Sequence, residues 1–263
     1  MVFVAGHFGE WLQGTVGPDR RVALVTLACP VAGVQAEVTG SGALAIEQNA
    51  DLVDDARCRR FLSALGLVER GHVRLRADLL PGGGAGMSTA ALVALARAAG
   101  AAEDRIAEAC LAVEGATDPL MLARPDGVLW APRDARPLRE VPLPPEAEIV
   151  GGFWGPPCRT DPQDLAFPHM DDLVAAWAEG PQLAEAARLA SLSAERTTAL
   201  RGPQDDPTPA IARRLGASGH ARAHTGSARA LIFAPGEAPA EAETTLTEAG
   251  LTHVRRFRTG GRA

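Results

Sequence analysis

The sequence predicts an α+β protein in which two α+β layers lie side by side, and three observations support this fold class. Both halves of the chain contain strand patterns with a period of two. Both halves also contain helix patterns with one apolar face. A turn-rich, proline-rich stretch from residue 119 to residue 145 separates them. We therefore expect an N-terminal domain over residues 1–145 and a C-terminal domain over residues 146–263.

The N-terminal half is expected to begin with strands and to continue with alternating helix and strand. The Val- and Leu-rich run from Arg21 to Leu27 predicts a buried strand, and the alternation from Ala32 to Thr39 predicts a half-buried one. Asp51 to Leu65 carries a broad apolar face and predicts a helix that stops at Gly66. The remaining elements expected in this half are a strand over 72–79 and helices over 88–99 and 104–114.

The C-terminal half has the same mixture of patterns. Its first expected strand, over 149–153, is followed by three helical patterns before the next strands. The expected elements after the first strand are helices at 171–179, 182–200 and 209–215, strands at 219–224 and 228–234, a helix at 239–249 and a last strand at 252–257.

The 263-residue chain contains no lysine and no tyrosine, so all 26 basic residues are arginines. Without lysine the chain has no Walker A lysine, no Schiff-base or pyridoxal-phosphate lysine and no protein-kinase strand lysine. Any bound phosphate must then be held by backbone amides, arginines, hydroxyl groups or a metal ion.

Charge and composition limit the possible partners. The net charge of −6 argues against a nucleic-acid partner, which requires a basic face. The most apolar stretch, from Ala90 to Ala102, is interrupted by Arg97 and is too short to span a membrane, and no secretory signal is evident. We expect a cytoplasmic monomer or homodimer with a small-molecule substrate. Its scattered cysteines should be reduced and mostly buried thiols: Cys29, Cys58, Cys110 and Cys158.

A glycine-rich loop is the most informative motif. Four glycines occupy five positions from Gly82 to Gly86, directly after Pro81 and an expected strand and directly before an expected helix. Such a loop lets backbone N–H groups converge on an anion, and the N-terminus of the following helix adds further unpaired N–H groups. Ser88 and Thr89 fall in or just before the first helical turn, where a hydroxyl group ligates Mg²⁺ or caps the helix. The motif predicts phosphate binding, and the alternative is a flexible turn with Ser88 as the N-cap.

The same segment also permits a different interpretation. The run from Gly86 to Ala90 is close to the Gly-x-Ser-x-Gly nucleophile elbow of α/β-hydrolases, with Asp118 and His224 following in the order of their triad. An elbow does not explain the three glycines before it, and the repeated strand–helix units of that fold are missing. We retain a serine hydrolase as a weaker alternative.

Two carboxylates stand four residues apart where a helix is expected to end. Glu114 and Asp118 are separated by small residues, and this arrangement suits Mg²⁺ binding and the orientation of a substrate hydroxyl group. The alternative is a solvated Glu114 followed by an ordinary Asp118-Pro119 turn.

The segment from Ala221 to Ser227 lies between two expected strands. Thr225, Gly226 and Ser227 form a small hydroxylated turn whose backbone is suited to face an anion or to close over a site. The alternative is a simple hairpin turn. His220 and His224 suggest zinc, but they should lie about 13 Å apart on an extended segment, with no cysteine nearby in the sequence.

Two further polar segments lie near the ends of the chain. Residues 6–14 are polar and glycine-spaced, and alone they fit a bulged edge strand. The arginines at 255, 256 and 258 predict the solvated face of a last strand, with contact to a phosphate as the alternative.

Three of these segments together resemble the GHMP kinases, the small-molecule kinases that include homoserine and mevalonate kinases. The signature of that family, Pro-x-x-x-Gly-Leu-Gly-Ser-Ser-Ala-Ala, aligns on Pro81 and, with one residue fewer after the proline, on residues 84–90, where Ser88 falls on the second serine. The resemblance implies an N-terminal half like ribosomal protein S5 domain 2 and a ferredoxin-like C-terminal half.

The closer resemblance is to the L-threonine kinases of cobalamin synthesis, also called propanediol-utilisation kinases. Their Cys-Gly-Glu-Leu-Ile-Gln-Gly is similar to residues 8–14, their Glu-Pro-Thr-Asp to residues 114–118 with one extra residue, and their Ala-His-Ser-Gly-Thr to residues 223–227. The chain departs from them in having Phe8 in place of cysteine and no lysine within the glycine loop.

The resemblance implies an ATP- and Mg²⁺-dependent kinase that phosphorylates a hydroxyl group of an amino-acid-like metabolite, with L-threonine as the leading substrate. It implies that Asp118 is the catalytic residue and that Ser88 and Glu114 hold Mg²⁺. The implied nucleotide-binding residues are Pro81, Gly82, Gly83, Gly84, Ala85, Gly86, Met87, Ser88 and Thr89. The implied substrate-binding residues are Glu10, Gln13, His224, Thr225, Gly226 and Ser227. The alternatives are a kinase for another small alcohol, such as homoserine, and a degenerate member that binds nucleotide without phosphoryl transfer.

Overall fold

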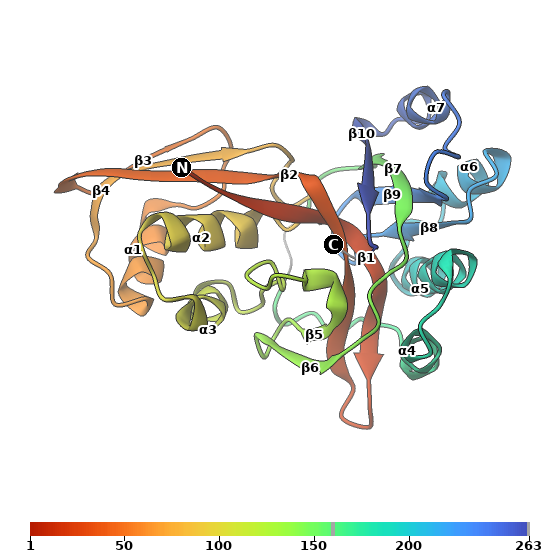
Figure 1. The fold of residues 1–263 in the computed structure, drawn as a ribbon, viewed down its shortest axis with the longest axis horizontal. Coiled ribbons are helices and arrows are strands. Elements are labelled where there is room, and N and C mark those ends of the chain that lie inside the picture. Colours follow the sequence, from red (N-terminus) through yellow and green to blue (C-terminus); the bar gives the residue numbers. More distant parts are fainter. Residues whose placement is uncertain (159–160, 262–263) are drawn as a thin grey trace.

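A single ten-stranded sheet runs through the protein, as seen in the computed structural model, which describes residues 1–158 and 161–261 (Figure 1). Its main path has the order β10-β7-β9-β8-β1-β2-β4-β3, and β5 joins β2 to β6. The strands are β1 (Val2–Val16), β2 (Arg21–Ala43), β3 (Ala45–Gln48), β4 (Arg70–Ala77), β5 (Val128–Ala131), β6 (Arg136–Glu140), β7 (Ala147–Phe153), β8 (Gly219–Arg222), β9 (Ala228–Phe233) and β10 (Thr252–Thr259).

The helices fall into two groups along the sheet. Helix α2 packs on β1, β2 and β4, and α3 contacts both α2 and α1, whereas α5 packs on β8 and β1 with α4 beside it, and α6 and α7 contact the strands of the C-terminal half (Figure 1). They are α1 (Asp55–Ala64), α2 (Met87–Ala98), α3 (Glu103–Glu114), α4 (Asp171–Ala178), α5 (Leu183–Arg201), α6 (Thr208–Arg214) and α7 (Ala242–Glu248), with a 3₁₀ turn η1 (Pro125–Gly127). None of these helices is long and apolar enough to cross a membrane.

The predicted α+β fold class is confirmed. In the C-terminal half, β7, β8, β9 and β10 are all antiparallel to their neighbours, and helices follow β7 and β9. This β-α-β-β-α-β sequence is that of ferredoxin-like folds. Because the sheet continues from β8 to β1, the division into two domains at residue 145 stays a prediction.

Strand β2 joins two segments that the sequence suggested were separate. The residues between Cys29 and Gly33 have no partner on β1, because Ala5 pairs with Gly33 and the next residue pairs with Cys29. Pro30, which lacks a backbone N–H, lies in this exposed bulge and so interrupts no sheet hydrogen bond. The strand therefore continues through the proline.

Strand β1 is bulged, as one interpretation of residues 6–14 suggested, but it is not an edge strand. It lies between β2 and β8, and its pairing register shifts between Ala5 and Gly6, between His7 and Glu10, and between Glu10 and Leu12. Bulges re-aim side chains and are common beside functional sites. Strands β3, β5 and β6 were not predicted, since four or five residues are too few to establish a period.

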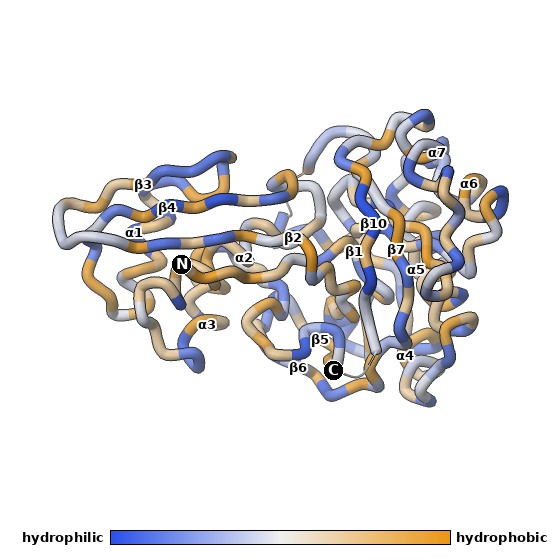
Figure 2. The backbone as a smooth tube through the Cα atoms, turned by 45° about the horizontal axis from the view of Figure 1, so that its top comes forward, coloured by the Kyte–Doolittle hydropathy of each residue, from blue (hydrophilic) through white to orange (hydrophobic). Residues whose placement is uncertain are grey.

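Aromatic and aliphatic side chains from both halves share one core. The ring of Phe8 lies 5.1 Å from that of Phe153 and 5.9 Å from that of Phe257, and Trp11 lies 5.7 Å from Trp177. Strand β7 is largely hydrophobic, whereas β10 at the end of the sheet carries hydrophilic segments (Figure 2). Phe8 and Trp11 come from the bulged part of β1, so this packing holds the bulge between the two halves.

Candidate active site

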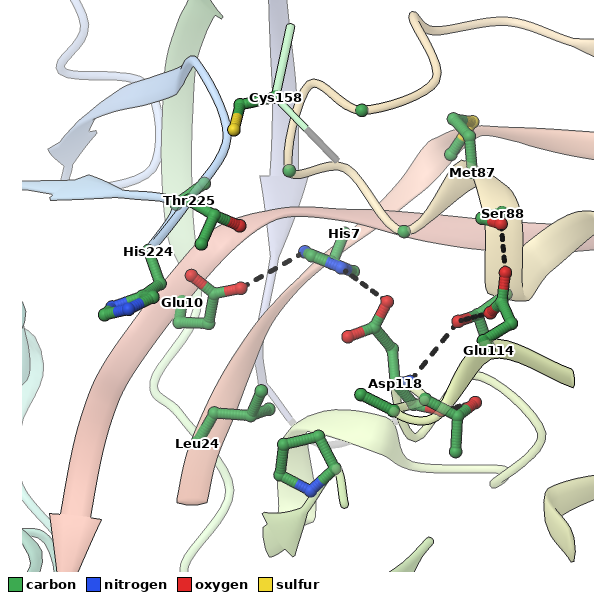
Figure 3. A pocket seen from close by; sticks show the side chains of 18 of the residues that line it. His7, Glu10, Leu24, Met87, Ser88, Glu114, Asp118, Cys158, His224 and Thr225 are labelled. Atoms are coloured by element: carbon green, nitrogen blue, oxygen red, sulfur yellow. Dashed lines mark hydrogen bonds and ion pairs between the residues drawn. The ribbon is translucent and has the colours of Figure 1, made fainter. Parts of the chain in front are cut away.

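A cavity of about 370 Å³ opens where the two halves meet. The bulge of β1, the glycine loop, the start of α2, the end of α3, helix α1 and the turn between β8 and β9 all contribute to its lining (Figure 3). Of the residues implied by the resemblance, the cavity is lined by Glu10, Gln13, Pro81, Gly82, Gly84, Gly86, Met87, Ser88, Thr89, Glu114, Asp118, His224 and Thr225.

The glycine loop turns its carbonyl groups away and leaves N–H groups available. The carbonyl oxygens of Gly82, Gly83, Gly84 and Ala85 accept hydrogen bonds from the N–H groups of residues 158, 228, 9 and 7, at 2.8 to 3.2 Å. Among the described residues, no backbone partner is found for the N–H groups of residues 84–89. These N–H groups and the start of α2 together form the kind of surface that binds phosphate.

Helix α2 begins without a side-chain cap. Its N-cap is Gly86, with a φ of +68°, and no side chain bonds to the free N–H groups. Ser88 lies inside the first turn, so the alternative interpretation of Ser88 as the N-cap is wrong. Three N–H groups of this turn are consequently left for a ligand.

The turn between β8 and β9 packs against the back of the glycine loop. A Cβ atom at Gly84 would lie 2.2 Å from that of Ala223, and one at Gly226 would lie 2.3 Å from the nitrogen of Gly84. Gly226 therefore contacts the loop rather than the cavity, and Gly83, Ala85 and Ser227 do not line the cavity either. The close packing also leaves no room for a side chain at position 84.

Ser88 and Glu114 meet at one end of the cavity, as their proposed metal role requires. The Ser88 hydroxyl hydrogen-bonds to Oε1 of Glu114, and Thr89 Oγ1 donates to Oε2 at 3.3 Å (Figure 3). Nη2 of Arg57, from α1, lies 2.5 Å from Oε1 of Glu114 and 3.2 Å from Oγ of Ser88. Burial raises the pKa of the Glu114 carboxyl, against the lowering effect of Ser88 and Arg57.

The donor set fits Mg²⁺. A serine hydroxyl and a carboxylate are hard oxygen ligands, and Mg²⁺ in phosphoryl-transfer sites takes few protein ligands and the rest from phosphate and water. Among the described residues, no group of three or more His, Cys, Asp or Glu side chains is placed to hold a metal by itself. A site of this composition is suited to a metal that arrives with a phosphate ligand.

Asp118 is held on the loop that follows α3. Its backbone N–H donates to Oγ1 of Thr89 at 3.3 Å, so Thr89 contacts both Glu114 and the Asp118 segment. The neighbouring Thr117 accepts a hydrogen bond from Nε1 of Trp130 at 2.6 Å. These contacts bring both carboxylates to the cavity although the sequence has one more residue between them than the motif it resembles.

His7, in the bulge of β1, lies between Asp118 and Glu10 (Figure 3). Its Nε2 is 3.2 Å from Oδ2 of Asp118, and its Nδ1 is 3.8 Å from Oε1 of Glu10. Burial alone would lower the pKa of His7, but the charge and hydrogen bond of Asp118 and the charge of Glu10 raise it to about 9. The imidazole is therefore a cation at neutral pH and fixes the orientation of the Asp118 carboxylate.

Two buried acceptor atoms lie beside this pair. Neither Oε2 of Glu10 nor Oε1 of Gln13 has a hydrogen-bond partner among the described residues, although both side chains are more than nine-tenths buried. Gln13 is oriented by the bond from its Nε2 to the carbonyl of Arg222, at 2.8 Å. Burial raises the pKa of Glu10 to about 7, opposed by the charges of His7 and Arg222. Unsatisfied buried acceptors call for a ligand that donates hydrogen bonds.

His224 forms part of the cavity wall opposite Ser88 and Glu114 (Figure 3). Its ring stacks on that of Phe167, with centroids 3.6 Å apart and planes within 5° of parallel. Cζ of Arg133 lies 5.6 Å from the centroid of the Phe167 ring. Burial, with the nearby charge of Arg201, lowers the pKa of His224 to about 3. His224 is therefore a neutral, aromatic wall of the cavity.

The structure does not assemble the hydrolase or zinc sites. Ser88 contacts Glu114 and Arg57, and Asp118 contacts His7, so neither reaches His224 as a triad requires (Figure 3). His220 and His224 belong to no cluster of metal-binding side chains among the described residues. The arginines of β10 do not line the cavity; Arg256 pairs instead with Glu148 and Glu243.

Sequence reasoning assigned no role to several lining residues, and four of these bear on the chemistry of the cavity: His7, Arg57, Arg133 and Phe167. His7 had a signal, because it belongs to the polar, glycine-spaced start of β1. For Arg57 the only sequence signal was the absence of lysine, because a chain without lysine must use arginine as its permanent cation. Arg133 and Phe167 lie in irregular segments that carry no motif.

Comparison with known proteins agrees with this geometry at the level of the fold. No protein-family model matches the chain, and no curated protein matches it by sequence. Solved structures do match over nearly the whole chain. Mevalonate kinase from Methanococcus jannaschii has a TM-score of 0.64 at 13% identity, covering 99% of this chain and 98% of its own. Mevalonate kinase from L. major has a TM-score of 0.61 at 11% identity, covering 98% and 96%.

A second kind of kinase also matches. Homoserine kinase from Cytophaga hutchinsonii has a TM-score of 0.56 at 16% identity, covering 88% of this chain and 85% of its own. These similar structures are small-molecule kinases, in agreement with the resemblance of the glycine-loop motif. The chain thus has the mixed α+β fold of the GHMP kinases.

Proposed function

We propose that the protein is a small-molecule kinase that transfers the γ-phosphoryl group of ATP to the hydroxyl group of an amino-acid-like metabolite, L-threonine, forming O-phospho-L-threonine. One observation carries the proposal. The free N–H groups of the glycine loop, the Ser88–Glu114 pair and Asp118 all lie on the same cavity. Phosphoryl transfer requires these three functions, and it is catalysed mainly by positioning and electrostatics.

The residues divide into a nucleotide side and an acceptor side. On the nucleotide side, the backbone of Gly84 to Thr89 would hold the phosphates, and Ser88 with Glu114 would hold Mg²⁺, which supplies positive charge to the phosphate oxygens when bound. On the acceptor side, the Asp118 carboxylate takes the proton of the attacking hydroxyl group. The oxygen then bonds to phosphorus as the bond to the leaving ADP oxygen breaks.

The chemistry of the acceptor side supports an amino acid. An ammonium group donates hydrogen bonds, which is what the unsatisfied oxygens of Glu10 and Gln13 lack. Arg133 lines the same cavity and offers a cation for a carboxylate. The choice of L-threonine among hydroxylated amino acids rests on the resemblance of residues 8–14, 114–118 and 223–227 to the L-threonine kinases.

The test is acceptor-dependent phosphorylation. Purified protein with Mg²⁺ and ATP is incubated with L-threonine, L-serine, L-homoserine, mevalonate and N-acetyl-L-threonine, and phosphorylated products are identified by mass spectrometry. We expect O-phospho-L-threonine and little product from mevalonate or N-acetyl-L-threonine, which lack the ammonium group. Product from mevalonate at the threonine rate would refute the amino-acid acceptor. ATP binding without any acceptor-dependent ADP would favour the degenerate, non-transferring alternative.

A further inference from the structure

Arg57 contacts both of the groups assigned to the metal. Its Nη2 lies 2.5 Å from Oε1 of Glu114 and 3.2 Å from Oγ of Ser88, and both charged side chains are largely buried, at 16% and 10% exposure. Arg57 projects from the first turn of α1, where the Asp54 side chain caps the helix by accepting its backbone N–H at 2.7 Å. The guanidinium group therefore reaches the site from a rigid element outside the glycine loop.

Arg57 supplies positive charge on the side of the cavity where a phosphate would bind. Among the described residues lining the cavity, the arginines are Arg57 and Arg133, and Arg133 lies on the other wall, against Phe167. A triphosphate brings several negative charges to the start of α2, whose N–H groups provide only partial positive charge. With no lysine in the chain, Arg57 is the permanent side-chain cation on this side of the cavity among the residues that the structure describes.

The contact also affects Glu114. Its Oε1 is already used by Arg57 and Ser88, and its Oε2 by Thr89. A cation bound there must compete with the guanidinium group of Arg57. A phosphate oxygen beside the Ser88 hydroxyl would offer Arg57 a second anionic partner, and guanidinium–phosphate pairs are among the strong, charge-assisted hydrogen bonds.

We propose that Arg57 is the phosphate-binding cation of this site and that, without a phosphate ligand, it occupies Glu114 in competition with the metal. The binding of metal and phosphate would then be coupled, because a phosphate that pairs with Arg57 leaves the Glu114 carboxylate free to bind the metal. This inference rests on the proposed function only in assigning the cavity to a phosphorylated ligand.

The test measures binding and needs no turnover. Isothermal titration gives the affinities of ATP, adenosine and inorganic tripolyphosphate for the wild type, Arg57→Gln and Arg57→Lys, and electron paramagnetic resonance gives the affinity of Mn²⁺ alone. The matched control is Arg59→Gln, on the same helix, where Arg59 makes exposed pairs with Asp55 and Glu69.

We expect Arg57→Gln to weaken tripolyphosphate and ATP by about tenfold to a hundredfold, the loss of one charge-assisted hydrogen bond, and to leave adenosine unchanged. Arg57→Lys should recover part of the loss, because it keeps the charge without the planar fork. Mn²⁺ alone should bind more tightly to Arg57→Gln. That gain should disappear in the double variant Arg57→Gln/Glu114→Gln, and Arg59→Gln should behave as wild type.

The outcomes separate this inference from the proposed function. Unchanged tripolyphosphate affinity in Arg57→Gln overturns the phosphate role, and unchanged Mn²⁺ affinity overturns the competition at Glu114, even where threonine is phosphorylated. Arg57-dependent binding of tripolyphosphate without phosphorylation of any acceptor supports the inference and refutes the kinase. A protein that binds neither ATP nor tripolyphosphate refutes both.

Discussion

Asp118→Asn tests the pair at the centre of the site, because His7 and Asp118 depend on each other. The pKa of His7 is raised to about 9 against the cost of burial, and the charge and hydrogen bond of Asp118 are the largest favourable causes. The interval between 6.5 and about 9 corresponds to about 3 kcal/mol at 1.36 kcal/mol per pKa unit. With the carboxylate removed, burial dominates, and we expect the pKa of His7 to fall to 6.5 or lower.

The pH dependence of stability follows from the same shift. A pKa that is raised on folding gives the wild type stability that is fully present below about pH 6.5 and is lost as the pH rises through about 9. Asp118→Asn should lack this loss. The decrease in the free energy of unfolding from pH 6 to pH 10, measured with urea, should therefore be about 3 kcal/mol larger in the wild type than in Asp118→Asn. NMR titration of the histidine ring resonances, with His7 assigned through His7→Gln, follows the pKa directly.

Phosphoryl transfer should be abolished in Asp118→Asn while ATP affinity changes little, because the nucleotide contacts assigned to residues 84–89 remain. Asp19→Asn, in the exposed turn between β1 and β2, is the matched control and should leave both the titration and transfer unchanged. A wild-type His7 titration in Asp118→Asn would show that the two side chains are not paired. Near-normal turnover in that variant would remove Asp118 from the catalytic role.

Two further predictions concern packing and acid stability. Gly84→Ala places a Cβ atom 2.2 Å from that of Ala223 at a φ of +79°, whereas Gly100→Ala, the control, has the same backbone strain at +78° with nothing within 4 Å of the new Cβ atom. The free energy of unfolding in urea should therefore be about 1–3 kcal/mol lower for Gly84→Ala than for Gly100→Ala. Equal values would contradict the close packing. The lowered pKa of His224, about 3, gives stability that is present above about pH 6.5 and is lost as the pH falls, at up to about 1.4 kcal/mol per pH unit. His224→Gln should reduce this slope in urea unfolding between pH 6.5 and 4, and an unchanged slope would show that His224 is not held neutral.

Much of the fold was predictable because its patterns are local. The helices at 171–178, 183–201 and 208–214 and the strands at 147–153, 219–222 and 228–233 lie within a few residues of the predicted ranges. The main differences, a continuous β2 and an interior β1, come from pairing with distant strands. Pro30 suggests a break in the chain, but the bulge between Cys29 and Gly33 accommodates it.

The parts of the candidate site that form contiguous sequence motifs were predictable. The contacts between residues far apart in the sequence were not. The glycine loop, Ser88, Glu114 and Asp118 are recognisable in the sequence, and they line one cavity. The resemblance also implied Gly83, Ala85, Gly226 and Ser227, which the structure places outside the lining. Within the glycine loop, Gly82, Gly84 and Gly86 line the cavity whereas Gly83 and Ala85 do not, so a motif does not show which of its members reach a ligand.

The sequence by itself determined the fold class, the phosphate-suited loop and the exclusion of every lysine-dependent chemistry, because composition and periodicity are properties of the chain alone. Only the tertiary structure decided that His7 pairs with Asp118 and that Arg57 pairs with Glu114, across separations of 111 and 57 residues. Those contacts depend on strand register, on the bulge of β1 and on the packing of α1 beside α3. A shift of one residue along β1 would turn His7 to the other face of the sheet.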